Sequence, residues 1–179
     1  MISLAILLAL AAPQEEIKDR KTFVSKTLKV SFSLPAAEWG TLRVGKDLEW
    51  KWTGGLCELL DAKTNVAGCL AAEPAPADGV DYVNAFEEGL QKNDGSKKLT
   101  RNGEPKKIEG DRTRIDYTWE YKEYKFSYVA IFWISEKSLC KLCIWVESHL
   151  WAEYGAAIDG IVNSLHPADV PAKIEHPWA

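Results

Sequence analysis

The chain has 179 residues, of which 46% are apolar and 27% are charged, and its formal net charge is −4. This length supports one domain with a hydrophobic core and argues against two, and the composition is that of a globular protein. The basic residues form no dense stripe, so neither a nucleic acid nor an anionic membrane surface is an expected partner.

The N-terminus begins with an apolar run, residues 2–11, that ends in the small-x-small pattern Ala9-Leu10-Ala11. A signal peptidase accepts such a pattern, and the run is well short of the roughly 20 residues that span a bilayer. We therefore expect residues 1–11 to be a signal peptide and the protein to be exported, to the periplasm or the extracellular space. A buried N-terminal helix or an uncleaved anchor is the alternative. We expect no membrane span elsewhere in the chain.

A polar segment, 12–21, precedes the first strand pattern. From Leu28 to Leu34 apolar and polar residues alternate strictly, which indicates a strand with one buried and one solvated face. Pro35 ends this strand, and residues 36–45 are expected to form a loop.

A hairpin is the best interpretation of the next stretch. Residues 49–52 alternate again, and residues 56–63 and 66–73 are apolar segments separated by Thr64-Asn65. Residues 56–60 have no clean period, so a short helix is the alternative there.

A helix is predicted over residues 82–92, capped by Asp78 or Asp81, whose side chain can accept hydrogen bonds from unpaired backbone N–H groups. Its apolar residues recur at helical spacing. They are Tyr82, Val83, Phe86 and Leu90. The polar and basic stretch 96–107 that follows is expected to form a loop.

Three strands are predicted in close succession, over residues 112–121, 124–134 and 139–147. The middle strand carries apolar residues at both odd and even positions, so we expect both of its faces to be buried and the strand to be central. A final helix is predicted from an apolar stripe that runs from Trp151 to Leu165, with Ser148 as its cap and Pro167 beyond its end.

These elements predict an α+β fold, in which helices pack on an antiparallel β-sheet and both faces of the central strand are covered. We expect a single domain over residues 22–166 and a short C-terminal tail over residues 167–179.

The order of these features resembles the Mog1/PsbP-like family, which includes the periplasmic DcrB-like proteins. The segments that carry the resemblance are Phe32-Ser33-Leu34-Pro35 followed by Trp39, the helix 82–92, the glycine turn 108–112, the aromatic strands around Tyr117 and Phe126, and the helix end 161–165. The resemblance covers residues 22–166 and implies an α/β/α sandwich. It also implies binding or scaffolding rather than catalysis, since members of the family serve a small GTPase, a photosystem or envelope components. No catalytic residue is carried over.

The four cysteines are not explained by this resemblance. In an exported chain an even number of cysteines indicates disulfides, and four allow three pairings. Cys57 and Cys69 flank the predicted hairpin and could face each other, and such a bridge would stabilise the fold by roughly 3 kcal/mol. Cys140 and Cys143 in one strand would point to opposite faces, roughly 10 Å apart. Cross-pairs such as Cys57 with Cys143 stay open.

Two further groups of residues are candidate functional sites. Cys140 and Cys143 form a C-x-x-C motif, so a redox or zinc site is an alternative to structural cysteines. Trp39, Trp50 and Trp52 are a candidate binding surface if exposed, although burial against the sheet is the simpler interpretation. The histidines form no constellation, and no nucleotide-binding, metalloprotease or hydrolase motif is present.

The sequence therefore favours an exported, non-enzymatic binding or scaffold protein of the cell envelope, whose partner is an unknown protein or small ligand. We expect a monomer without a cofactor. The alternative is a thiol-based redox or zinc-binding protein that uses Cys140 and Cys143.

Overall fold

The computed structural model describes residues 15–26, 28–35, 40–44, 47–48, 54–61, 63, 65–77, 81–135 and 137–167. The elements follow in the order β1 (Glu15–Lys18), β2 (Thr22–Ser25), β3 (Val30–Ser33), β4 (Thr41–Val44), β5 (Gly55–Asp61), β6 (Val66–Pro74), α1 (Tyr82–Gln91), β7 (Ser96–Arg101), β8 (Lys106–Ile108), β9 (Arg112–Tyr121), β10 (Tyr124–Ser135), β11 (Ser138–Glu147), α2 (Trp151–Asn163) and β12 (His166–Pro167). The expected signal peptide lies outside the described residues, as does the tail beyond Pro167. None of the helices in the described ranges has the length and apolar character that crossing a membrane requires.

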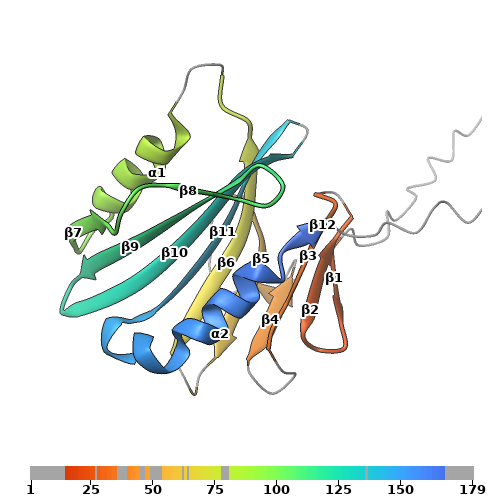
Figure 1. Ribbon diagram of the computed structural model, residues 1–179, viewed down its shortest axis with the longest axis horizontal. Helices are drawn as coiled ribbons and strands as arrows, with labels where there is room; N and C mark the ends of the chain where they lie inside the picture. Colours follow the sequence, from red (N-terminus) through yellow and green to blue (C-terminus); the bar gives the residue numbers. More distant parts are fainter. Residues whose placement is uncertain are drawn as a thin grey trace, which may run out of the picture.

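Most strands belong to one antiparallel sheet of eight strands, in the order β4-β5-β6-β11-β10-β9-β7, with β8 paired to β9. A second sheet of four strands has the order β1-β2-β3-β12. The helices α1 and α2 lie on opposite sides of the large sheet, and the small sheet stands beside α2 (Figure 1). The predicted α+β class, with helices packed on an antiparallel sheet, is confirmed.

The large sheet is buried on both faces, as the apolar pattern of its central strands predicted. The α2 face packs against α2 and the small sheet, and the α1 face packs against α1. Strand β11 shows the alternation most clearly. Its Cys140, Leu142, Ile144 and Val146 belong to the core on the α2 face, and its Leu139 and Cys143 belong to the core on the α1 face.

The small sheet is fastened to the end of α2 by hydrogen bonds. The backbone N–H of Ser33 donates to the Ser164 hydroxyl oxygen at 2.9 Å. The ring of His166 lies 3.1 Å from the Ser31 hydroxyl and 2.6 Å from the Ser164 carbonyl. These contacts hold the short strand β12 beside β3, where the C-terminal tail was expected to start.

The N-terminal segment contains a strand that the sequence did not indicate. Strand β1 lies within the polar segment 12–21 and pairs with β2, and Ile17 packs at the margin of the core. The predicted hairpin of 56–63 with 66–73 is confirmed as β5 and β6.

The prediction of a loop over residues 96–107 is wrong, because β7 and β8 lie there. Lys97 and Lys98 are exposed on β7, and only part of the strand contributes to the core. β7 is the edge strand of the sheet, where exposed lysines are common because they discourage pairing with other chains. A strand of this kind lacks the apolar alternation by which strands are recognised.

The predicted cap of α1 is confirmed, and the predicted cap of α2 is wrong. Asp81 caps α1, and its carboxylate accepts hydrogen bonds from the backbone N–H groups of Val83 at 3.1 Å and Asn84 at 3.0 Å. Ser148 does not cap α2, because a turn of 3₁₀ helix at Ser148–Leu150 precedes that helix. The Ser148 hydroxyl instead accepts a hydrogen bond from the Ser127 hydroxyl at 3.2 Å.

Gly68 is the point of closest approach between β6 and β11, which provides a test of the fold. A Cβ at Gly68 would lie 2.6 Å from the carbonyl oxygen of Cys143, closer than such atoms can approach. We expect Gly68→Ala to lower the free energy of unfolding, measured in urea, by about 1–3 kcal/mol.

The matched control is Gly160→Ala in α2, where an added Cβ meets no described atom within 4 Å. We expect that change to raise stability by about 0.5–1 kcal/mol, because alanine is the better helix former. Equal effects of the two substitutions would contradict the close approach of the strands.

Candidate functional site

Three of the sequence-derived candidates, Trp39, Trp50 and Trp52, lie outside the described residues. They remain a sequence-based candidate surface. The described candidates are the cysteines, and all four are buried thiols.

Cys57 and Cys69 do not face each other as expected. In the β5–β6 pairing Cys57 lies opposite Leu70, and Cys69 lies opposite Glu58. The register differs by one residue from the expected one, and one residue is enough to turn a side chain to the other face of a sheet. Cys57 therefore lies in the core on the α2 face, and Cys69 lies in the core on the α1 face.

Cys140 and Cys143 lie on opposite faces of β11, as their spacing predicted. Two thiols in this arrangement cannot bond to each other or share a metal ion without a change of the strand. Within the described ranges no group of three or more histidine, cysteine, aspartate or glutamate side chains could hold a metal ion.

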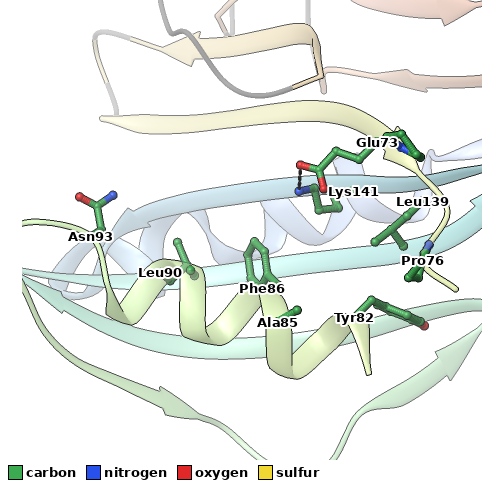
Figure 2. A pocket seen from close by; sticks show the side chains of 11 residues that line it. Glu73, Pro76, Tyr82, Ala85, Phe86, Leu90, Asn93, Leu139 and Lys141 are labelled. Atoms are coloured by element: carbon green, nitrogen blue, oxygen red, sulfur yellow. Dashed lines mark hydrogen bonds and ion pairs between the residues drawn. The ribbon is translucent and has the colours of Figure 1, made fainter. Parts of the chain in front are cut away.

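The structure adds a site that the sequence did not indicate, a groove of about 420 Å³ between α1 and the ends of β6 and β11. We call it the α1 groove. It is lined by Glu73, Pro74, Pro76, Tyr82, Ala85, Phe86, Gly89, Leu90, Asn93, Leu139 and Lys141. Figure 2 shows the side chains of α1 on one side of the groove and Glu73, Lys141 and Leu139 of the sheet on the other.

The wall of the groove is positioned by the apolar stripe of α1. The ring of Phe86 packs edge-on against Phe132, with centroids 5.1 Å apart, and also contacts Tyr117 and Tyr128. Tyr82 packs against Phe132 at 5.7 Å. These aromatic contacts anchor the helix to β9 and β10, so the groove opens on its other flank, over β6 and β11.

One ion pair lies within this mostly apolar lining. The ammonium group of Lys141 lies 2.6 Å from the Glu73 carboxylate, and the two side chains are 16% and 32% exposed. The same ammonium group lies 6.0 Å from the centre of the Phe86 ring. A ligand in the groove would therefore meet apolar walls together with a strong hydrogen-bond donor and a strong acceptor.

A cluster of buried polar groups lies on the same face, next to the groove. Hydrogen bonding between the thiols raises the pKa of Cys69 and lowers that of Cys143, while burial raises the pKa of Tyr128. The hydroxyl groups of Tyr117 and Tyr128 are buried near Glu87 and Cys143, and neither makes a hydrogen bond of normal geometry within the described ranges. Burial, and then the nearby Glu87 carboxylate, raise the pKa of Tyr117, so both phenols are neutral at physiological pH.

Sequence analysis missed the groove because it is made by segments far apart in the chain. One signal was present: Lys141 occupies a position of β11 where the alternation places a core residue, between Leu139 and Cys143. A lysine at such a position needs a partner or a ligand, since an unpaired charge is costly to bury.

The ion pair provides a measurable test of the groove's polar centre. We expect a double-mutant cycle of Glu73→Gln and Lys141→Met to give a coupling of about 1–2 kcal/mol in urea unfolding, because the pair is partly shielded from water. The matched control is the pair Glu88–Lys92 on the outer surface of α1, at 2.9 Å and 64% and 76% exposed. Its coupling should stay below about 0.5 kcal/mol. A coupling at Glu73–Lys141 no larger than the control would contradict a shielded pair.

Comparisons with known proteins identify the fold. No family model matches the chain, and no curated protein matches it in sequence. The solution structure of cyanobacterial PsbP (CyanoP) from Synechocystis matches with a TM-score of 0.62 and 11% identity, over 89% of this chain and 95% of that one. The crystal structure of PA94 from Pseudomonas aeruginosa, a protein of unknown function, matches with a TM-score of 0.52 and 13% identity, over 72% and 96%.

A third solved structure, the Ran-binding protein Mog1p of Saccharomyces cerevisiae, matches with a TM-score of 0.47 and 9% identity, over 79% of this chain and 91% of that one. At these identities the similarity concerns the fold alone. The match to CyanoP carries this conclusion, because it has the TM-score of 0.62 over 89% of this chain. The chain has the Mog1/PsbP-like fold that its sequence resemblance predicted.

Proposed function

We propose that this protein is a non-enzymatic binding or scaffold protein and that its ligand or partner segment is held in the α1 groove. The observation that carries the proposal is the groove itself, an open apolar hollow that contains one ion pair, Glu73–Lys141. Its volume of about 420 Å³ falls within the range of ordinary ligand sites.

The lining supports recognition rather than covalent chemistry. The side chains that form the groove are apolar, apart from Asn93, the Tyr82 hydroxyl and the ion pair. No histidine, cysteine or serine is among the lining residues, so the Ser–His and Cys–His arrangements of nucleophilic catalysis are not part of this lining. A ligand that is mainly apolar with one or two polar groups matches this surface.

The walls of the groove are suited to binding without large rearrangement. Phe86 is held by three aromatic rings of β9 and β10, and α1 is capped by Asp81. Lys141 and Glu73 extend from two strands that pair in the middle of the sheet. A site on such rigid elements loses little conformational entropy when it binds.

The proposal includes export to the cell envelope, and the support for that part is the apolar run 2–11 with its Ala9-Leu10-Ala11 end. We further propose that the protein acts as a monomer.

Filling the groove should weaken binding. Ala85 lines the groove from α1 and is exposed, so a tryptophan at this position would occupy the hollow with little disturbance of the core. We expect compounds from a fragment library, detected by ligand-observed NMR, to shift the backbone amide signals of Phe86, Leu139 and Lys141, and Ala85→Trp to weaken their binding at least tenfold.

The matched control is Asn84→Trp, on the neighbouring exposed position of the same helix, which does not line the groove. This variant should bind like the unmodified protein, and both variants should retain its circular dichroism spectrum. Equal binding by Ala85→Trp and the unmodified protein would place the ligand elsewhere and overturn the proposal.

Export has a separate test. We expect the full chain, expressed with an alkaline phosphatase reporter at its C-terminus, to give reporter activity that depends on the N-terminal run. We expect mature protein to begin near Ala12, as measured by N-terminal sequencing. Replacing Leu7 and Leu8 by arginine should abolish both results, because charges interrupt the apolar run. Reporter activity that survives these changes would contradict export by this segment.

A further inference from the structure

Two of the cysteines face each other across the centre of the large sheet. Strands β6 and β11 are antiparallel, and Cys69 lies directly opposite Cys143 in their register. Both side chains belong to the core on the α1 face, and they are 3% and 2% exposed. Directly opposed residues of an antiparallel pair have Cα atoms about 4.5–5.5 Å apart, which lies within the span that a disulfide requires.

We propose that Cys69 and Cys143 form a disulfide that joins β6 to β11, and that Cys57 and Cys140 remain thiols. The sequence allowed three pairings and favoured a bridge between Cys57 and Cys69. The observed register separates those two residues onto opposite faces and brings Cys69 to Cys143.

The other pairings are excluded by the same geometry. Cys57 and Cys140 share the α2 face, but β6 lies between their strands β5 and β11. Two strand spacings amount to about 9.5 Å, which exceeds the roughly 7 Å beyond which cysteines cannot be bridged. Each remaining combination would join a cysteine of one face to a cysteine of the other.

The surroundings of the two sulfurs are consistent with a bond between them. The two thiols are opposite each other in the same core, and their proximity raises the pKa of Cys69 and lowers that of Cys143. Gly68, next to Cys69, allows the strands to approach closely, because any larger residue would place its Cβ against the Cys143 carbonyl oxygen.

The bond forms by thiol–disulfide exchange with an oxidised thiol–disulfide oxidoreductase or a small disulfide such as oxidised glutathione. The thiolate of one cysteine attacks the donor disulfide and expels one donor thiolate, which takes up a proton. The second cysteine loses its proton and attacks the resulting mixed disulfide, which expels the second donor thiolate. The protein loses two hydrogen atoms and the donor becomes two thiols. Because both sulfurs are buried in the folded chain, this exchange takes place before β6 and β11 close over them.

The disulfide would tie together segments that are distant in the sequence. It closes a loop of about 75 residues, and loops of this length give a large entropic stabilisation on the chain-entropy model. The same two strands carry Glu73 and Lys141, so the bond would also fix the sheet beneath the α1 groove. The inference does not depend on what the groove binds.

The test uses the full chain, refolded in a buffer of oxidised and reduced glutathione, denatured, and alkylated without reduction. Trypsin cleaves after Lys51, Lys63, Lys92, Lys137 and Lys141, which places each of the four cysteines on its own peptide. We expect mass spectrometry to show peptide 64–92 linked to peptide 142–173, with Cys57 and Cys140 alkylated. Alkylation of Cys69 and Cys143 before reduction, or a link between any other pair, would overturn the proposal.

Thermal unfolding provides an independent readout. A phosphine reductant should lower the Tm of the oxidised protein by roughly 5–15 °C. The double variant Cys69→Ala/Cys143→Ala should unfold at the same temperature with and without reductant, whereas Cys140→Ala should remain sensitive to it. An oxidised protein whose Tm does not respond to reductant would refute the bridge, even if the double variant were less stable for reasons of packing.

Discussion

The burial of β10 and β11 on both faces is the constraint on which the rest of the structure depends. Alternate residues of these strands enter two different cores, so neither face can be left to water. The α2 face is covered by α2 together with the small sheet, and the α1 face is covered by α1. The hydrogen bonds between Ser164 and β3 serve this burial, because they hold the small sheet against α2, and the two together cover the α2 face.

The unequal cover of the two faces explains where the groove lies. α1 (Tyr82–Gln91) is held by aromatic contacts to β9 and β10. On the other flank of α1, side chains from the ends of β6 and β11 line the groove. Lys141 lies at this margin and is paired with Glu73. An apolar residue there would extend the core, whereas the ion pair places a charged donor and a charged acceptor at this margin of the sheet, and the proposed ligand would have to satisfy the pair or leave it intact.

Much of the fold was predictable from periodicity, and the failures have identifiable physical causes. Strands buried on one or both faces, such as β9 to β11, carry their signal in the alternation of apolar residues, and α1 carries both a cap and a stripe. Strand β7 was missed because an edge strand carries exposed lysines in place of an apolar face. The 3₁₀ turn before α2 was missed because Ser148 resembles a cap although its hydroxyl bonds to Ser127. The groove was missed because the pairing of Glu73 with Lys141 joins positions remote in sequence.

The cysteines show that the sequence pattern predicts strands but not the register in which they pair. The hairpin of β5 and β6 was predicted correctly, yet Cys57 pairs with Leu70 and Cys69 pairs with Glu58. A shift of one residue in the turn would have placed Cys57 opposite Cys69 on a shared face, and both arrangements are compatible with the same apolar pattern. What decides between them is the burial of whole strand faces, since the other register would turn either Leu59 of β5 or Leu70 of β6 away from the core on the α2 face. The position of each thiol is therefore a consequence of the two cores rather than of local turn chemistry, and the encounter of Cys69 with Cys143 follows from the packing that also creates the α1 groove.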